Sequence, residues 1–366
     1  MSTIPESGDL LSAPCAEAGS SVVRDQCIAG TAPRSRAPVF IVGCPRSGTT
    51  LLYHMLLSAG GFAIYRAESN VFNLLALRFG DLRVWKNRQK LMDSWLRSQM
   101  FVASGLDAKE IEARVLDQCR SSGDFFRVVM EQIAHQQNVD RWADCTPEHL
   151  LYAEAIQETF PGALVVHIIR DGRDVALSLA QLGWIRPMLP QRNGKLVAAA
   201  LFWEWIVQKG RAMGRRIAPY YKEVRFEDLI REPPRVLAEL GPFIDHDLDY
   251  DRIRRVAIGT VSQPNTSFRG ELARDAFDPV RRWERSLPPD GLPALERLIG
   301  DCLSDLGYPL TTAPGLRSSG APKLKLARAV YRRYFDSKFW LKMHTPFGKF
   351  RSGEDDRLDA IPGVPD

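Results

Sequence analysis

The chain has 366 residues, 45% of them apolar, and its 49 Lys and Arg against 44 Asp and Glu give a formal net charge of +5. This composition allows a sizeable core, and it excludes fibrous and low-complexity proteins. No apolar run reaches the length of about 18 residues that a membrane-spanning helix needs, and no signal-peptide pattern opens the chain, so the expected location is cytoplasmic. The six cysteines are scattered without metal-type pairing, and no nucleic-acid-binding module accompanies the positive charge. We therefore expect neither a metal site nor a nucleic-acid partner.

The first ordered elements are expected from Pro38 onward. Residues 1–37 are rich in Ser, Ala, Gly and Pro without periodicity, which predicts a disordered leader. The apolar run Val39 to Val42 predicts a strand. Apolar residues on one face of Thr49 to Ser58 predict a helix directly after it. The pattern is that of a βα unit.

Further strands alternate with helices along the chain. An aliphatic run at Ala163 to Ile169 is typical of a central parallel strand, and shorter strands are expected at Arg141 to Asp144 and Lys222 to Phe226. The sequence therefore predicts an α/β fold of P-loop type, a parallel sheet flanked by helices, with helical inserts forming the acceptor side. Helices are expected at Glu68 to Phe79, Ala108 to Arg120, Phe125 to Gln136, Pro147 to Glu158 with Thr146 as N-cap, and Gly194 to Ile217.

The loop between the first strand and its helix has the form of a phosphate loop. Gly43 to Thr50 reads Gly-Cys-Pro-Arg-Ser-Gly-Thr-Thr. Loops that hold a nucleoside triphosphate place Lys after the second Gly, but Thr49 stands there instead. The loop should therefore hold a phosphate without handling a triphosphate and its metal, and the guanidinium of Arg46 supplies the positive charge. The expected ligands of this anion are Arg46, Ser47, Gly48, Thr49 and Thr50.

A second polar motif follows the third strand. Arg170 to Ser178 reads Arg-Asp-Gly-Arg-Asp-Val-Ala-Leu-Ser. A strand that ends in Arg and a following helix that carries Ser can bring both side chains to one phosphate, provided that the turn folds Arg170 back toward Ser178.

The two motifs together resemble those of the sulfotransferases that use 3′-phosphoadenosine-5′-phosphosulfate (PAPS), and the bacterial and tyrosylprotein-type branch looks nearest. The resemblance covers Pro38 to Leu310, which we expect to be the sulfotransferase domain (38–310). It implies that the first motif binds the 5′-phosphosulfate and that Arg170 and Ser178 bind the 3′-phosphate. It also implies an enzyme that moves a sulfuryl group to an acceptor hydroxyl without a metal. Further residues implied at the nucleotide are Phe226, which could stack on adenine or belong to the core, and Ser267 and Arg282, near the loop that closes over the nucleotide.

The acceptor must lose a proton as it attacks, so a general base is needed. Glu68 lies in a context similar to that of the base in tyrosylprotein-type enzymes. His149 stands in a Thr-Pro-x-His pattern that is similar to one in bacterial relatives. We favour Glu68 over His149, and both remain candidates.

One position departs from the family pattern. Relatives usually carry Lys where this chain has Cys145, and the lost cation would have helped to neutralise the transferring group. A catalytically decayed protein that binds the desulfated nucleotide is therefore one alternative. A P-loop kinase or NTPase is another, opposed by Thr49.

The end of the sequence is strongly basic. Residues 311–352 are expected to form a linker and a basic amphipathic helix, followed by a disordered tail at 353–366. Nine Lys and Arg lie between Lys323 and Arg351 against the single acid Asp336. The helix could pack on the domain or contact an anionic membrane surface. The sequence determines neither the acceptor nor the oligomeric state.

Overall fold

A parallel sheet forms the centre of the computed structural model, which describes residues 33–188, 193–261, 278–287, 291–313 and 321–345. Within these residues the sheet has four strands in the order β2-β1-β3-β4. Each pair is parallel, as in the match of Val39 with Leu164. The predicted parallel α/β class is confirmed. The strands are β1 (Val39–Gly43), β2 (Ala143–Asp144), β3 (Leu164–Ile169) and β4 (Tyr221–Arg225).

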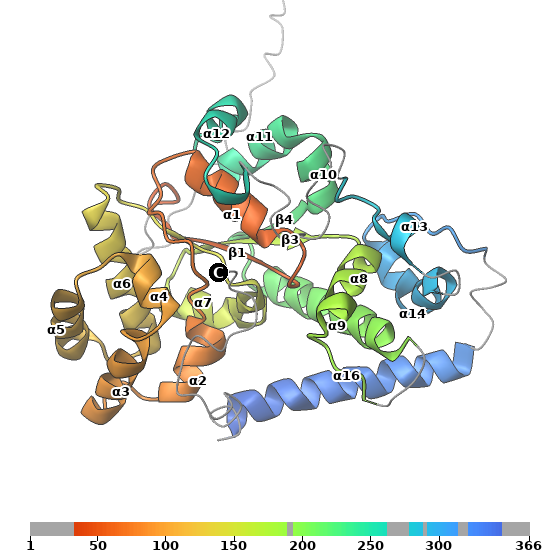
Figure 1. Cartoon of the computed structure of the whole chain (residues 1–366), viewed down its shortest axis with the longest axis horizontal. Helices are drawn as coiled ribbons and strands as arrows, with labels where there is room; N and C mark the ends of the chain where they lie inside the picture. Colours follow the sequence, from red (N-terminus) through yellow and green to blue (C-terminus); the bar gives the residue numbers. More distant parts are fainter. Residues whose placement is uncertain (1–32, 189–192, 262–277, 288–290, 314–320, 346–366) are drawn as a thin grey trace, which may run out of the picture. The chain divides into compact units, whose positions relative to one another are not determined.

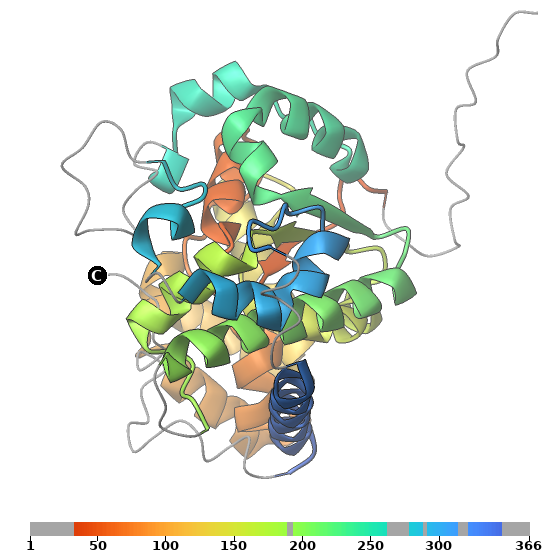
Figure 2. The ribbon, with the colours of Figure 1, turned by 90° about the vertical axis from the view of Figure 1, so that its right-hand side faces the viewer.

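Helices cover both faces of the sheet (Figures 1 and 2). The first face packs against α1 (Thr49–Ser58), α10 (Phe226–Arg231), α11 (Pro233–Ile244) and α12 (Tyr250–Val256), with η3 (Gly259–Val261) beside α1. The second face packs against η2 (Pro147–Tyr152), α7 (Ala153–Thr159), α8 (Gly172–Leu182) and α9 (Gly194–Arg216). The helical insert comprises η1 (Val71–Leu75), α2 (Ala76–Phe79), α3 (Trp85–Trp95), α4 (Gln99–Ser104), α5 (Ala108–Gln118) and α6 (Ser122–Gln136), and the later helices are α13 (Trp283–Ser286), α14 (Gly291–Asp305) and α16 (Ala321–His344).

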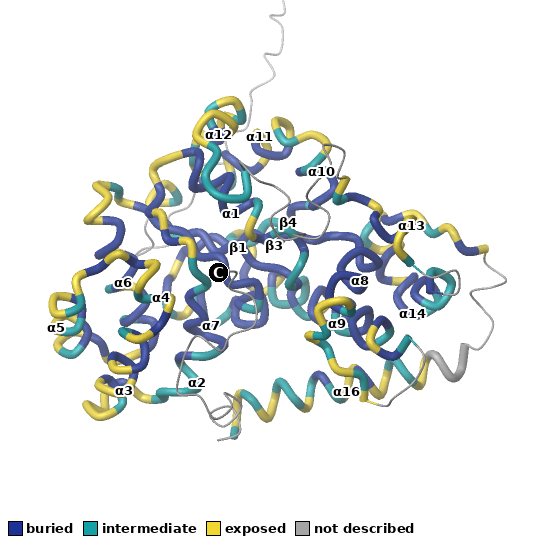
Figure 3. The backbone as a smooth tube through the Cα atoms, viewed as in Figure 1, coloured by how far each residue is buried: buried dark blue, intermediate teal, exposed yellow. Residues whose placement is uncertain are grey.

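Alternate residues of β1 supply the two halves of the core. Val39 and Ile41 pack into the cluster that contains α1, whereas Phe40 and Val42 pack into the cluster that contains α6 and α9. All four side chains are fully buried. A strand buried on both faces must be apolar at every position, which is why the sequence pattern identified it. Figure 3 shows β1 and β3 as buried, whereas β4 is only partly buried.

Three local expectations differ from the structure. The helix expected from Glu68 begins at Val71, because Asn70 adopts a left-handed conformation with φ of 49°. Thr146 does not cap the following helix. Its hydroxyl instead accepts a hydrogen bond from the amide of Ser69 at 3.1 Å, so it makes a tertiary contact and does not cap the helix. Helices α3 and α4 were not expected.

Two predicted segments fall largely beyond the described part of the chain. The leader at 1–37 is described only from residue 33, and the tail at 353–366 lies outside the described residues, as does Ser267. The predicted basic helix is present as α16.

Candidate active site

The phosphate loop joins the end of β1 to the start of α1. Arg46 and Gly48 adopt positive φ angles of 75° and 93°. A Cβ atom on Gly48 would lie 2.3 Å from the ring of Phe226, so both the backbone conformation and the space require glycine there. The tight turn leads directly into α1, whose N-terminal amides and dipole favour an anion at the loop.

The two predicted motifs meet in space. The Nε atom of Arg46 donates to the Ser178 hydroxyl at 3.1 Å, and a guanidinium N–H of Arg170 donates to the Arg46 carbonyl at 3.1 Å. Arg170 directly follows β3, which is the neighbour of β1 in the sheet. The carboxyl ends of adjacent parallel strands lie at the same edge, so both arginines reach one point.

Arg282 belongs to the same cluster of arginines. Burial lowers the pKa of Arg46, and the nearby charges of Arg170 and Arg282 lower it further. Burial also lowers the pKa of Arg170, although Asp174 and Glu227 oppose this effect. A cluster of like charges of this kind is relieved by a bound anion.

Buried polar atoms at the loop also fit a phosphorylated ligand. Within the described residues, the hydroxyl of Ser47 and the Nε atom of Arg170 are buried without a hydrogen-bond partner. Buried donors are normally satisfied, so such atoms need a partner supplied from elsewhere. Phosphate oxygens of a nucleotide would satisfy them.

The ring of Phe226 packs against residues of both motifs. Its ring is buried, lies against Gly48 and stands 4.6 Å from the guanidinium carbon of Arg170. The ring therefore packs between the two motifs, and its predicted stacking on adenine stays a prediction.

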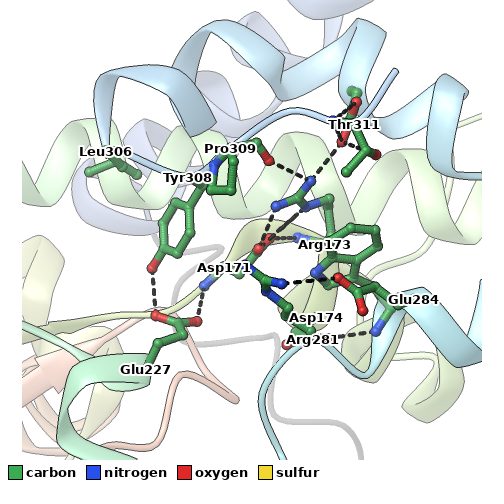
Figure 4. A network of polar contacts seen from close by, with 12 residues as sticks. Asp171, Arg173, Asp174, Glu227, Arg281, Glu284, Leu306, Tyr308, Pro309 and Thr311 are labelled. Carbon is green, nitrogen blue, oxygen red and sulfur yellow. Dashed lines mark hydrogen bonds and ion pairs between the residues drawn. The ribbon is translucent and has the colours of Figure 1, made fainter. Parts of the chain in front are cut away.

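A buried ionic network fixes the turn that carries Arg170 (Figure 4). Arg173 binds Asp171 at 2.7 Å and Glu296 of α14 at 2.6 Å, and its guanidinium lies 3.9 Å from the centre of the Trp283 ring. Asp174 accepts the backbone amide of Trp283 at 2.9 Å. The network thus ties the segment that delivers Arg282 to α8.

Glu227 connects the network to the end of β4. It accepts the backbone amide of Asp171 at 2.9 Å and the Tyr308 hydroxyl at 2.9 Å (Figure 4). Sequence reasoning missed Glu296 and Tyr308 as supports of the site. Asp171, Arg173 and Asp174 carried a signal because they belong to the second motif, and Glu227 carried one because it lies in Val224 to Leu229, which resembles the acidic segment that ends a strand in the family.

Glu68 lies near Cys145. Burial raises the pKa of Glu68 to about 8, and the charges of Asp144 and Glu148 add to this effect. Glu68 in turn raises the pKa of Cys145, whose thiol hydrogen-bonds the side chains of Thr49 and Thr50. Among the described residues, no side-chain hydrogen bond or ion pair involves the carboxylate of Glu68.

His149 occupies a different environment. Its ring is fully buried, with Nδ1 2.8 Å from a carboxylate oxygen of Asp144. The amide of Phe72 donates to its Nε2 atom at 3.3 Å. Nε2 is then the unprotonated nitrogen and Nδ1–H donates to Asp144, so both ring nitrogens have protein partners. This geometry anchors η1 to β2.

Other features of the described residues bear on cofactors and membranes. They contain no cluster of three or more His, Cys, Asp or Glu side chains that could hold a metal ion. They also contain no helix that is long and apolar enough to cross a membrane.

A parallel sheet with an arginine-bearing phosphate loop, and a second arginine after the neighbouring strand, defines an α/β enzyme of the phosphate-loop class. Residues 38–250 match the profile of the sulfotransferase family, and the chain belongs to this family.

Comparison with individual proteins gives more distant matches. The chain is 26% identical over 286 residues to an uncharacterized protein of Aquifex aeolicus, covering 70% of this chain and 32% of that protein. It thus spans about a third of the length of that curated relative.

Similar solved structures are sulfotransferases. The sulfotransferase domain from the curacin biosynthetic pathway is 17% identical, with a TM-score of 0.49, and the match covers 75% of this chain and 99% of that one. The domain from the Synechococcus PCC 7002 olefin synthase is 20% identical, with a TM-score of 0.48 and coverages of 75% and 96%. A sulfotransferase from Mycobacterium avium is 18% identical, with a TM-score of 0.42 and coverages of 77% and 79%.

Proposed function

We propose that the chain transfers the sulfuryl group of PAPS to an acceptor hydroxyl, with Glu68 as general base and without a metal ion. The convergence of Arg46, Ser178 and Arg170 at one edge of the sheet carries this proposal. It supports a cationic site for the nucleotide, and the proposal of Glu68 as base is supported by burial, which raises the pKa of Glu68 to about 8.

The proposed roles follow from the two motifs. Loop amides and the hydroxyls of Ser47, Thr49 and Thr50 would surround the 5′-phosphosulfate, with Arg46 as the cation beside the transferring group. Arg170 and Ser178 would hold the 3′-phosphate, and Arg282 would close the site from α13. Arg46 has a guanidinium and can serve both anions, which suits its hydrogen bond to Ser178.

PAPS supplies a sulfuryl group that is already joined to a good leaving group, the phosphate of the bisphosphate product. The Glu68 carboxylate accepts the proton of the acceptor hydroxyl while the new sulfur–oxygen bond forms and the bond to the phosphate breaks. The negative charge that remains on the phosphate is stabilised by Arg46 and the loop amides. No redox step is involved, and atoms and charge balance.

Cys145 supplies no positive charge to the transferring group. The Cys145 side chain is buried and its pKa is raised well above the ordinary value by burial and by Glu68, so it stays a neutral thiol. We therefore assign the neutralisation of the transferring group to Arg46. Membership of the sulfotransferase family favours this reaction over phosphoryl transfer by a kinase or NTPase.

The first test is binding. We expect 3′,5′-adenosine bisphosphate without metal to raise the Tm of the protein, because a ligand that binds only the folded state stabilises it. Stabilisation by Mg-ATP and not by the bisphosphate would contradict the proposal.

The second test is transfer of labelled sulfate from PAPS into a panel of hydroxyl acceptors. Glu68→Gln is expected to lower kcat by about 10²- to 10⁴-fold, the usual contribution of a general base, and to leave bisphosphate affinity unchanged. Glu148→Gln is the matched comparison, since it removes a neighbouring carboxylate outside the proposed proton path, and it should keep its activity at about pH 9, where Glu68 is ionised in both proteins. Full activity of Glu68→Gln would move the base elsewhere, and His149 would be tested next.

A further inference from the structure

Exposed apolar side chains are concentrated in one part of the described chain. Eight of its 13 exposed large apolar residues lie on α16 or in segment 182–188. The amide of Met188 donates to the Tyr331 hydroxyl of α16 at 3.2 Å, so the two segments are neighbours. The eight are Leu326, Val330, Trp340, Leu341 and Met343 of α16 together with Leu182, Trp184 and Met188.

The opposite side of α16 is packed on the domain. Tyr331 and Phe335 are buried in the core cluster that contains α9, and Phe335 stands 5.6 Å from Trp205, measured between ring centres. Arg328 binds Glu204 of α9 at 2.6 Å. The helix is therefore seated along the molecule, as Figures 1 and 2 show, and its other side is left for a partner.

The charged residues of α16 are mostly basic, and one of them, Arg332, also acts on the acids Asp336 and Glu204 on the domain side. Asp336, the only acidic residue of α16, faces the domain, where it accepts from Trp205 at 3.0 Å and pairs with Lys209 at 2.9 Å. The exposed basic residues are Lys325, Arg332 and Arg333. The outward face of α16 thus combines apolar side chains with positive charge and has no acid.

We propose that the outward face of α16 binds an anionic membrane surface. Basic side chains are attracted to anionic headgroups, and apolar ones with a Trp enter the boundary between headgroups and acyl chains. A second copy of this face is a poor partner, because two cationic surfaces would meet. Two acids near α16 are paired with its basic side chains: Asp301 of α14 with Arg328 at 3.0 Å, and Glu148 with Lys342 at 3.7 Å.

The test is sedimentation of the full chain with vesicles. We expect the protein to pellet with vesicles of equal parts phosphatidylserine and phosphatidylcholine, to stay in solution with phosphatidylcholine alone, and to be released by salt. Arg332→Gln with Arg333→Gln should weaken binding by about 30-fold, since each basic residue near the surface contributes about 1 kcal/mol. Trp340→Ser with Leu341→Ser should also reduce pelleting.

A matched control lies on the other face of the sheet. Arg254, Arg255 and Val256 are exposed on α12, which packs in the other core cluster. Arg254→Gln with Arg255→Gln, and Val256→Ser, should leave vesicle binding unchanged. A cooperative thermal melt verifies that every variant is folded.

Three outcomes would overturn the proposal. These are no pelleting of the wild-type chain with the anionic vesicles, equal pelleting of the α16 and α12 variants, and light scattering that shows a dimer abolished by Trp340→Ser with Leu341→Ser. The last result would make this face an interface between copies. None of these measurements requires sulfuryl transfer, so the proposal and the proposed function fail independently.

Discussion

The raised pKa of Glu68 suits a general base, whereas its burial disfavours the ionised carboxylate. Burial and the neighbouring acids Asp144 and Glu148 raise its pKa to about 8. A carboxylate with such a pKa is a stronger base than an ordinary one, but a smaller fraction of it is ionised at neutral pH. The sulfotransfer rate should report this balance.

We expect kcat/KM to rise with pH and to level off above about pH 8, because Glu68 must be ionised to accept the proton of the acceptor. Glu148→Gln removes a negative charge that raises the pKa of Glu68, so its profile should shift to lower pH. The measurement is a pH series of initial rates at limiting acceptor for both proteins. A flat profile from about pH 6 to pH 9 would argue against Glu68 as the base.

The same pKa makes Glu68 costly for stability. The folded chain holds a proton on Glu68 up to about pH 8, whereas the unfolded chain releases it near pH 4.5. Folding is therefore favoured below the lower value, and stability is lost as pH rises through the folded pKa.

Glu68→Gln cannot ionise and should raise Tm by a few degrees at about pH 9, with no gain at about pH 4. Scanning calorimetry at the two pH values tests this expectation. A Tm difference that does not depend on pH would contradict the buried, raised pKa, and Asp301→Asn, at an exposed acid on α14, serves as the control for removal of an acid.

At the scale of elements, the turn after β3 depends on groups that come from four separate segments. Arg173 is almost fully buried between Asp171, Glu296 and the Trp283 ring. Removing one member of a buried ion pair leaves an uncompensated charge, which costs about 3–5 kcal/mol.

A substitution at Asp174 tests the turn after β3 with a smaller expected loss of stability. Asp174→Asn keeps the size of the side chain but weakens its bond to the Trp283 amide and removes an acid that supports the charge of Arg170. We expect weaker bisphosphate binding, by about 10-fold, with a smaller change in Tm. Calorimetric titration measures the affinity. As a control, Asp301→Asn alters an exposed acid on α14 and should change neither value.

The sequence predicted these elements to different degrees, for physical reasons. β1 and β3 are buried on both faces, so their apolar runs identified them to within about a residue. Helix α3 was missed because three of its 11 residues are Lys or Arg and only four are apolar. Thr146 was expected to cap a helix, but local sequence cannot show that the amide of Ser69 competes for its hydroxyl.

The residues of the candidate site were also predictable to different degrees. The loop and the Arg170 motif were predictable because each is contiguous in sequence, and the structure brings Arg46 and Ser178 into contact. The support by Glu296 and Tyr308 was not predictable, because residues that are far apart in the chain meet only through tertiary packing. The choice between Glu68 and His149 became sharper once burial and hydrogen-bond partners were known.

At the scale of the whole molecule, α16 and α1, the helix that follows the phosphate loop, belong to different core clusters. Tyr331 and Phe335 of α16 belong to the core cluster on the second face, whereas α1 belongs to the cluster on the first. We therefore expect the helix to stabilise the domain without changing the proposed nucleotide site.

Phe335→Ala tests whether α16 stabilises the domain without affecting bisphosphate binding. The Phe335 ring is buried against Phe202 and Trp205, with ring centres 5.6 Å apart in each pair. Its removal leaves a cavity and should lower the free energy of unfolding by about 3–5 kcal/mol. Bisphosphate affinity of the folded protein should stay within about twofold, since no part of the phosphate loop contacts the ring. Denaturant unfolding measures the first quantity and calorimetric titration the second. Leu326→Ala, at a side chain that is 66% exposed on the same helix, should cost little stability. If Phe335→Ala were as stable as the wild type, α16 would not be part of the folded domain.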